Sequence, residues 1–496
     1  MKNYVLVIDE GTTGTRALIF NKEFKIVAQS YEEFTQYTPS SDKAEHDAME
    51  IYEKSVKMCK KAFADSGISP GEIAAIGITN QRATYVVWDK ATGEPLCRAI
   101  VWQDSRTGAR CAELNASEWG AKAKKATGWT IAPVYSSLMI EWLMKNNPEV
   151  KAKIDAKEAL SGTIDTWLVW KLTGGKVHAV SYSNASVMGS MDLSTAEWYT
   201  EFLDYLGIPL HILPEIREDS GDFGTTDPSI FGAPIPICAC IADQHSALYA
   251  QGCRTPGTAK LTNGTGSFLD MNIGENCVVL KGGINTVIAW KIKGKIMYAM
   301  EGYAAVTGSA IQWLRDGLNI IEKSADSEAL ARSVTDTNGV YFVPALTGLG
   351  APYWDPFARG TIIGITRGTT KAHICRATLE AIAFSIKDIT DDIARNTGSP
   401  VKEIKIDGGA SANNLLAQFF ADILDCKVSR PASVEATSLG AAQMAGLYAG
   451  VWTEKDFEGA VQYDAEFVSS ISDEEREVRY SEWIEAVKRS ANWIKH

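Results

Sequence analysis

The sequence predicts an α/β protein whose two large domains face one phosphorylated ligand. At 496 residues the chain is too long for a single hydrophobic core. A β-prone run enters a Gly/Thr turn within residues 9–16, and a second one enters a Gly-Thr-Gly turn at residues 264–266. Two such turns, halfway along the chain from each other, indicate two similar domains, which we place at residues 1–250 and 251–496.

The first turn, DEGTTGTR, lies between two strand-like runs, Tyr4 to Ile8 and Ala17 to Phe20. This pattern predicts a β-hairpin. Its glycines let backbone N–H groups approach a bound anion, and the threonine hydroxyls and Arg16 add donors, so the turn can form an anion nest. Asp9 sits where the first strand ends, and a carboxylate beside such a nest suggests a metal ion between them. A plain glycine-rich hairpin is the alternative interpretation.

Two further turns fit the same ligand. The stretch 258–269, TAKLTNGTGSFL, repeats the hairpin pattern. The stretch 405–414, KIDGGASANN, leads from a strand into the apolar periodic segment Leu415 to Leu424. Its Gly-Gly turn allows a flat or phosphorylated ligand to approach a helix N-terminus closely. The sequence contains neither a G-x-x-x-x-G-K-[ST] loop nor a strand-following G-x-G-x-x-G.

Composition and charge narrow the class of protein. A net charge of −12 and a pI near 5.2 argue against nucleic acid or an anionic membrane as partner. No apolar run reaches the ~18 residues of a membrane span. The chain enters a strand at Tyr4 and has an acid at Asp9, so we expect no signal peptide and a cytoplasmic location. The nine cysteines favour free buried thiols over a disulfide or metal site.

Periodicity places the remaining elements. In the first half it predicts a helix over 44–66, strands over 73–79, 85–88 and 99–101, helices over 106–126, 136–147 and 158–173, a loop-rich region over 205–234 and a strand over 235–241. In the second half it predicts strands over 284–292, 295–299 and 339–344, helices over 306–318 and 371–395, and a helical, charged segment over 452–496.

Three side chains follow strand ends, where ligands collect in open α/β sheets. Arg82 lies just past the strand over 73–79 and is a candidate for a ligand group. Trp102 could pack its face on the C–H side of a polyol or sugar, or it could be a core residue. Asp243 stands between a strand and a helix, where it could accept a proton from a substrate hydroxyl or simply cap the helix.

The chain resembles the glycerol kinases of the FGGY carbohydrate kinase family over essentially its whole length. The matching stretches are DEGTTGTRA at 9–17, AAIGITNQR at 74–82, AIVWQDSRT at 99–107, IADQHSAL at 241–248, NGTGSF at 263–268, GSAIQWLRD at 308–316, PALTGLGAPYWDPFARG at 344–360 and DGGASANN at 407–414. The resemblance implies two actin-like, RNase H-type domains, with ATP, Mg²⁺ and a polyol in the catalytic cleft between them.

The resemblance also assigns roles to individual residues. It implies that the nucleotide is held by Thr12, Thr13, Gly14 and Arg16 of the first phosphate loop, by Thr265 of the second, and by Gly308, Gln312, Gly409 and Asn413. It makes Asp243 the catalytic base and places Asp9 and Asp243 near Mg²⁺. The polyol would contact Arg82, Trp102, Tyr135, Asp243, Gln244 and Phe268.

Three departures from the family pattern concern substrate and regulation. Ala83 stands where glycerol kinases have a Glu that binds a terminal hydroxyl, and Val134 stands at the pocket tyrosine unless Tyr135 replaces it. The loop at 224–234 carries no cation, whereas family members regulated by fructose 1,6-bisphosphate carry Lys and Arg there. We therefore expect an enlarged, less polar pocket that favours a polyol of four or five carbons over glycerol.

The sequence thus predicts an ATP- and Mg²⁺-dependent kinase that phosphorylates a primary hydroxyl of a small polyol, either glycerol or a four- to five-carbon sugar alcohol. A non-kinase actin-like ATPase and a catalytically silent glycerol-kinase-like protein are the alternatives. Asp243 and Gln244 together with Arg82 and Trp102 favour the kinase, because a chaperone or filament needs no polyol pocket. We expect a small-molecule polyol as the partner, and a homo-oligomer, a dimer, as the assembly.

Overall fold

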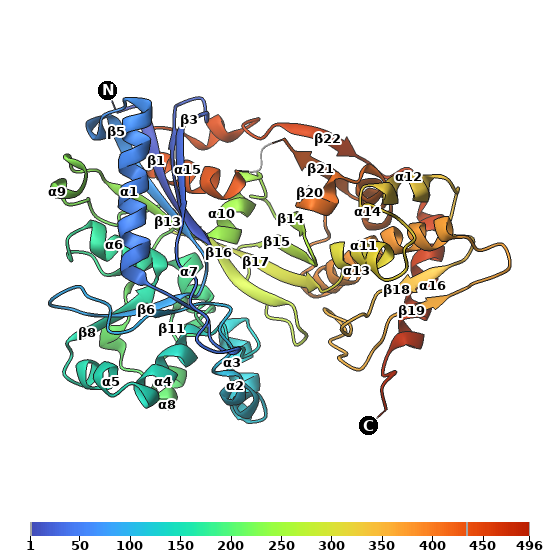
Figure 1. The fold of residues 1–496 in the computed structure, drawn as a ribbon, viewed down its shortest axis with the longest axis horizontal. Coiled ribbons are helices and arrows are strands. Elements are labelled where there is room, and N and C mark those ends of the chain that lie inside the picture. Colours follow the sequence, from blue (N-terminus) through green and yellow to red (C-terminus); the bar gives the residue numbers. More distant parts are fainter. Residues whose placement is uncertain (1, 433–434, 496) are drawn as a thin grey trace.

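The computed structural model describes residues 2–432 and 435–495, which form two α/β halves side by side (Figure 1). The first half contains a five-stranded sheet in the order β13-β5-β1-β2-β3. Its strands are β1 (Tyr4–Glu10), β2 (Gly14–Phe20), β3 (Ile26–Glu33), β5 (Ile73–Asn80) and β13 (Ile237–Ala242).

The second half contains a seven-stranded sheet in the order β16-β17-β15-β14-β20-β21-β22. Its strands are β14 (Thr258–Asn263), β15 (Ser267–Gly274), β16 (Asn285–Ile292), β17 (Lys295–Ala304), β20 (Glu403–Asp407), β21 (Lys427–Pro431) and β22 (Tyr463–Phe467).

The two sheets share one topology. In the first, β1, β2 and β3 pair antiparallel, and β5 and β13 follow parallel on the other side of β1. In the second, β14, β15 and β17 pair antiparallel, and β20 and β21 follow parallel on the other side of β14. This repeated order is the RNase H-type arrangement, so the expected fold class is confirmed. Strands β16 and β22 extend the second sheet at its two edges.

Smaller sheets lie outside these two. A four-stranded sheet joins β4 (Glu45–His46), β7 (Ala99–Ile100), β6 (Tyr85–Asp89) and β8 (Ala159–Thr163). Three two-stranded sheets pair β9 (Ala179–Ser181) with β12 (Glu215–Arg217), β10 (Met191–Asp192) with β11 (Glu197–Trp198), and β18 (Tyr341–Val343) with β19 (Thr361–Ile363).

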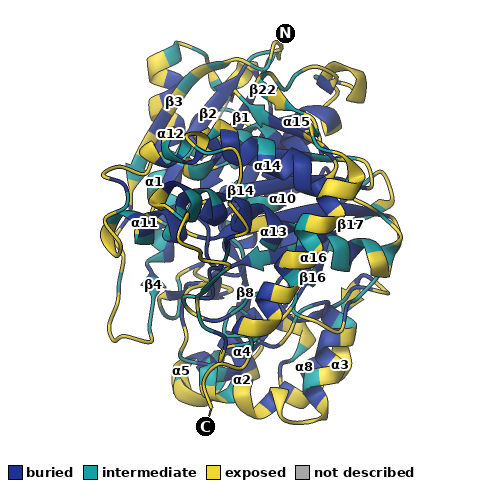
Figure 2. Ribbon diagram, turned by 90° about the vertical axis from the view of Figure 1, so that its right-hand side faces the viewer, coloured by how far each residue is buried: buried dark blue, intermediate teal, exposed yellow. Residues whose placement is uncertain are grey.

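Helices cover the sheets and leave a buried interior inside an exposed shell (Figure 2). Those of the first half are α1 (Ala48–Ser66), α2 (Gly108–Asn115), α3 (Glu118–Thr127), α4 (Ser136–Asn146), α5 (Pro148–Asp155), α6 (Ile164–Leu172), α7 (Tyr182–Ser186), α8 (Thr200–Leu206), α9 (Pro228–Phe231) and α10 (Asp243–Ala250). Those of the second half are α11 (Gly308–Asp316), α12 (Asp326–Arg332), α13 (Lys371–Thr397), α14 (Asn414–Leu424), α15 (Ala436–Tyr448) and α16 (Asp473–Ser490). Among the helices of the described chain, none is long and apolar enough to cross a membrane.

Helix α15 belongs to the second half of the sequence but packs on the first sheet, against β1, β5 and β13, and against α10 (Figure 1). Two glycines make this approach possible. A Cβ on Gly440 would lie 2.1 Å from the carbonyl oxygen of Ser246 in α10, and a Cβ on Gly77 of β5 would lie 2.4 Å from that of Ala441. The division near residue 250 stays a prediction, and α15 crosses it in space.

Two expectations about secondary structure were wrong in part. The helix expected over 158–173 is strand β8 followed by α6, because Leu160 pairs with Trp88 of β6 and this pairing outweighs local helix preference. The segment over 452–496 contains strand β22 before α16, because Phe467 pairs with Val428 of β21. Local periodicity does not report such long-range pairing.

Glu10 at the end of β1 is buried beside Asp9. Its carboxyl group accepts hydrogen bonds from the hydroxyls of Thr15 and Ser55. Burial raises the pKa of this carboxyl to about 8, although both hydroxyls oppose the rise. The protonated form favours the folded state, so this contribution is full below the unfolded pKa near 4.5 and is lost as pH rises towards 8.

We predict that Glu10→Gln stabilises the protein, and more so at pH 8 than at pH 5. The amide keeps an acceptor for both hydroxyls but cannot ionise, so it removes the penalty that grows with pH. A melting-temperature gain of about 2–4 °C at pH 8 is expected from thermal unfolding. Glu23→Gln on the exposed surface is the control and should change little at either pH. An equal gain for Glu10→Gln at both pH values would contradict the assigned protonation.

Candidate active site

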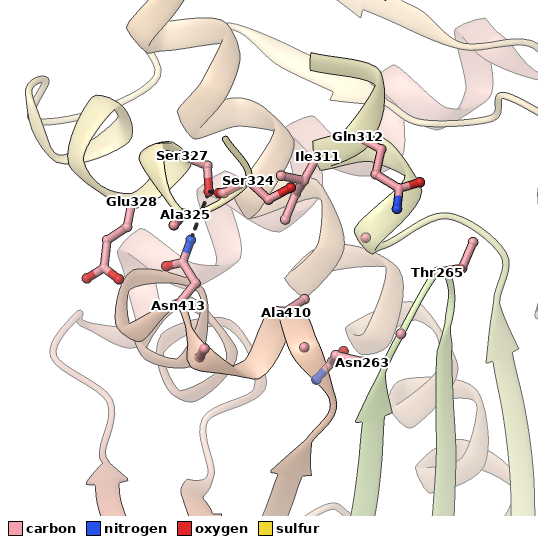
Figure 3. Close-up of a pocket in the computed structure, with 14 residues that line it drawn as sticks. Asn263, Thr265, Ile311, Gln312, Ser324, Ala325, Ser327, Glu328, Ala410 and Asn413 are labelled. Atoms are coloured by element: carbon pink, nitrogen blue, oxygen red, sulfur yellow. Dashed lines mark hydrogen bonds between the residues drawn. The ribbon is translucent and has the colours of Figure 1, made fainter. Parts of the chain in front are cut away.

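A cavity of about 440 Å³ opens in the second half, within the size range of small-molecule sites (Figure 3). Its wall combines three segments far apart in sequence: the β14–β15 turn, the start of α11 and the Gly-Gly turn after β20. All five residues predicted to hold the nucleotide in this half line it, namely Thr265, Gly308, Gln312, Gly409 and Asn413.

Backbone contacts hold these segments at a fixed distance. The N–H of Gly308 donates to the carbonyl oxygen of Gly264 at 3.0 Å, and the N–H of Thr307 donates to that of Thr265 at 3.0 Å. A Cβ on Gly308 would lie 2.5 Å from the Gly264 oxygen. Gly408 has φ +85°, and a Cβ there would lie 2.5 Å from the carbonyl oxygen of Asn263. These glycines therefore let the turns meet and form one rim.

Helix α12 and the residues before it form the far wall of the cavity, which sequence reasoning missed. Ser324, Ala325, Ser327 and Glu328 line it, and the Asn413 amide donates to the Ser327 hydroxyl at 3.3 Å (Figure 3). The stretch around α12 carries no glycine-rich or strand-end signal, so its position follows only from the packing of α12 on α13 and α14.

Two glutamine side chains hold the backbone of the first hairpin turn in place. The Gln81 side chain donates to the carbonyl oxygen of Gly11 at 3.0 Å, and the Gln36 side chain donates to that of Thr12 at 3.1 Å. Thr13 is exposed at the tip, whereas Gly14 is buried, with a Cβ there only 2.7 Å from the Tyr31 ring and the Glu32 carbonyl oxygen. The missing side chain of Gly14 therefore serves packing against β3.

Asp9 is buried at the base of this hairpin. Its Oδ2 accepts from Arg16 at 2.9 Å and from Ser438 of α15 at 2.5 Å, and Arg16 also pairs with Glu435 at 2.7 Å. Burial raises the pKa of the Asp9 carboxyl; Arg16 and Ser438 lower it in part, and the charge of Asp243 adds to the rise. Two carboxylates thus act on each other across the site.

The residues predicted to bind a polyol come from both halves. The Arg82 guanidinium lies 3.7 Å from Oδ1 of Asp243 and is hydrogen-bonded to Glu301 of β17. Asp243 is the first residue of α10, and Ala242 is the N-cap, so Asp243 is not the simple helix cap of the alternative interpretation. Burial raises the pKa of the Asp243 carboxyl, and Arg82 offsets that rise only in part. A carboxylate with a raised pKa suits a general base.

Two aromatic rings predicted for the polyol site are exposed. Trp102 is 41% exposed, and its indole N–H donates to the Thr12 hydroxyl at 3.0 Å, which ties it to the first hairpin. Phe268 on β15 is 52% exposed and packs on Tyr303 with ring centroids 4.5 Å apart. Exposed rings of this kind can pack on the C–H face of a polyol.

Tyr135 is not brought to the site, which corrects one sequence expectation. It is fully buried, and its hydroxyl donates to the carbonyl oxygen of Trp129 at 2.7 Å and lies 2.8 Å from the Thr127 hydroxyl. Val134, the other residue considered for this position, is partly exposed. Ala83 is also fully buried at φ +63°, and its carbonyl oxygen accepts from Ser136 at 3.0 Å.

Three residues around Arg82 and Gln244 were also missed at the sequence level. Glu301 pairs with Arg82, and Lys260 donates to Gln244. Both are charged residues inside apolar strands, a signal that the sequence offers. Trp129 lies with its ring 6.0 Å from the Arg82 guanidinium, and its indole N–H is buried without a hydrogen-bond partner in the described residues.

Comparison with known proteins agrees with this geometry. The family model for the N-terminal domain of FGGY carbohydrate kinases matches residues 4–250, and that for the C-terminal domain matches residues 259–449. The chain belongs to the FGGY family of carbohydrate kinases. The predicted resemblance is therefore confirmed, and this FGGY kinase is an enzyme of the phosphotransferase class.

Relatives of this FGGY kinase cover its whole length. It is 47% identical to glycerol kinase 2 of Thermotoga maritima, over 99% of each chain. It is also 47% identical to a glycerol kinase of Carboxydothermus hydrogenoformans, over 99% of each chain. The crystal structure of Plasmodium falciparum glycerol kinase with ADP matches with TM-score 0.94 and 35% identity, covering 100% of this chain and 99% of the other. Xylulose kinase from Rhodospirillum rubrum shares the fold, with TM-score 0.85 at 22% identity over 98% of each chain.

We predict that Gly308→Ala weakens nucleotide binding, because the added Cβ would push α11 away from the Gly264 turn. The loss should be roughly tenfold in the ATP dissociation constant measured by calorimetry, the equivalent of about 1.4 kcal/mol of misfit. Gly282→Ala is the matched control, since a Cβ there has open space within 4 Å. An unchanged constant in Gly308→Ala would show that this junction does not shape the cavity.

Proposed function

We propose that this FGGY kinase transfers the γ-phosphoryl group of ATP to a primary hydroxyl of a small polyol, with glycerol as its preferred substrate. The arrangement at the start of α10 carries the proposal: the Asp243 carboxyl lies 3.7 Å from the Arg82 guanidinium, which also pairs with Glu301 of the second half. The nearby 440 Å³ cavity gives the nucleotide a place. The names of the full-length relatives support glycerol.

The protein needs to do little covalent chemistry in this reaction; it mainly positions the reacting groups and stabilises charge. In phosphoryl transfer the substrate hydroxyl oxygen forms a bond to the γ-phosphorus, and the bond from that phosphorus to the ADP oxygen breaks. Asp243 receives the hydroxyl proton, and Arg82 holds a polyol oxygen by donating to it. The Thr12 and Thr265 hairpins contribute hydroxyl and backbone donors to the phosphates. Closure of the two halves would exclude water and suppress hydrolysis of ATP.

Asp9 and Asp243 fit a Mg²⁺ ion. In the described chain no cluster of three or more His, Cys, Asp or Glu could hold a metal ion alone. Mg²⁺ usually takes only one or two carboxylates and completes its shell with water and phosphate oxygens. Asp9 is buried and Asp243 is partly exposed, and a cation beside them would relieve the repulsion between their two carboxylates. Such an ion would neutralise charge on the transferred phosphoryl group.

The structure gives no support to the enlarged pocket expected at Ala83. A residue with no exposed surface does not open new space, and Tyr135 is held in the core. Glycerol is therefore the first substrate proposed, with four- and five-carbon polyols as competitors because Ala83 and Val134 leave that end without the family's polar partners. Arg82, Asp243 and Gln244 would bind the reacting end of either.

We predict that Asp243→Asn removes turnover while nucleotide binding survives. The amide keeps the size of the carboxylate but cannot accept the hydroxyl proton, and loss of a general base typically costs about 10²–10⁴-fold in rate. Coupled-enzyme kinetics and ATP calorimetry measure the two properties separately. A kcat near the wild-type value in this variant would reject the assigned role.

We predict that glycerol leads a panel of dihydroxyacetone, erythritol, threitol, xylitol and ribitol in kcat/KM. A longer polyol ahead of glycerol by a wide margin would overturn glycerol as substrate and keep the kinase. ATP hydrolysis that no polyol accelerates would overturn the polyol kinase altogether.

A further inference from the structure

Lys260 lies inside the second sheet, on β14, with only 1% of its surface exposed. Its ammonium group donates to Oε1 of Gln244 at 2.9 Å and to the hydroxyl of Thr262 at 3.0 Å, and it pairs with Asp270 of β15 at 3.0 Å. An ammonium group only donates, and here it has two hydrogen-bond acceptors and one ion-pair partner. These contacts hold the Lys260 ammonium group in one position.

The contact decides which way the Gln244 amide faces. Because Lys260 can only donate, the atom of Gln244 that meets it must be the carbonyl oxygen, and the NH₂ group must point away. Gln244 follows Asp243 at the start of α10 and is partly exposed, so its NH₂ group, turned away from Lys260, is able to meet a ligand. An unrestrained glutamine could present either end of its amide.

We propose that Lys260 is a positioning and specificity-determining residue, which locks Gln244 so that it donates a hydrogen bond to the polyol. This inference rests on the proposed function, because it names the group that the polyol must offer at that point. Arg82 also only donates, so the oxygen bound between Arg82 and Gln244 acts as an acceptor. Asp243 accepts the proton of the reacting hydroxyl. The pocket thus requires one polyol oxygen that accepts hydrogen bonds from Arg82 and Gln244, and a second hydroxyl that gives its proton to Asp243.

Asp270 lowers the free-energy cost of burying the charge of Lys260. It is itself 2% exposed and lies on the strand next to Lys260, directly opposite it in the antiparallel register. Burial disfavours the charged form of Lys260, but Asp270, Asp407 and Asp243 together outweigh this effect and keep the pKa of the ammonium above its ordinary value. Lys260 therefore stays a donor across the working pH range. Removing either member alone leaves a buried charge unpaired.

The same contact joins the two halves of the site. Strand β14 carries Lys260 and ends at Asn263, where the second phosphate turn begins with Gly264 and Thr265. Gln244 belongs to α10 at the other side. Lys260 therefore fixes the polyol amide relative to the strand that delivers the phosphate turn, which sets the distance between the two substrates.

The test is the variant Lys260→Met/Asp270→Leu, which removes the ion pair as a unit and leaves the Gln244 amide free. We expect the KM for glycerol to rise about tenfold, as for the loss of one charge-assisted hydrogen bond, while the KM for ATP changes less than about twofold. Gln244→Ala should then cost much less in this background than in the wild type. Lys405→Met is the matched control, since Lys405 is a buried lysine at the same register on β20 that pairs with Glu403. It should leave the glycerol KM unchanged.

The outcomes separate this inference from the proposed function. A wild-type enzyme that turned over no polyol would overturn both. Polyol turnover by the wild type, with a glycerol KM that the double variant leaves unchanged or a Gln244→Ala cost equal in both backgrounds, would overturn only the role of Lys260.

A second measurement needs no Lys260 variant. Gln244→Glu keeps an oxygen for Lys260, whereas Gln244→Met leaves the ammonium short of a partner. Thermal unfolding should therefore give Gln244→Glu a melting temperature at or above that of the wild type and Gln244→Met a clearly lower one. Equal melting temperatures for the two variants would show that Lys260 does not hold this side chain.

Discussion

The close packing of α10 on α15 is the constraint on which the rest of the active site depends. Helix α10 begins with Asp243 and Gln244, and α15 brings Ser438 to Asp9. The two helices touch backbone to backbone at Gly440, and the hydroxyl of Ser246 donates to the carbonyl oxygen of Thr437 at 2.6 Å. A larger side chain at Gly440 would separate Asp243 from the hairpin that carries Asp9.

Around this contact the buried and partly buried charges lie beside charges of opposite sign. Arg82 lies between Asp243 and Glu301, Lys260 pairs with Asp270, and Arg16 lies between Asp9 and Glu435. An unpaired charge buried as deeply as Lys260 or Asp270 would cost several kcal/mol. Pairing lowers that cost and also fixes directions, because guanidinium and ammonium groups only donate and ionised carboxylates only accept.

Much of this arrangement could be predicted from the sequence, and the failures have physical reasons. Both Gly/Thr hairpins were visible because glycine and alternating β-prone residues are local signals, and Thr265, Gly308, Gln312, Gly409 and Asn413 do line one cavity. Strand β8 was mistaken for helix because its partner β6 lies far back in the chain. Tyr135 was misplaced because a one-residue choice between Val134 and Tyr135 depends on which side chain the core can bury. Trp129 reaches Arg82 through tertiary packing that no local pattern reports.

The shared strand order of the two sheets gives the molecule an approximate twofold pseudosymmetry, whereas a nucleotide and a polyol have none. Each half therefore offers the same framework, a hairpin turn at an equivalent place, to a different part of the ligand pair. The first hairpin has a buried acid, Asp9, at its base. The second hairpin instead borders a cavity that Gln312 and Asn413 also line. Because each half contacts a different ligand, substitutions in one half can change the ligand that it binds while the contacts of the other half stay the same.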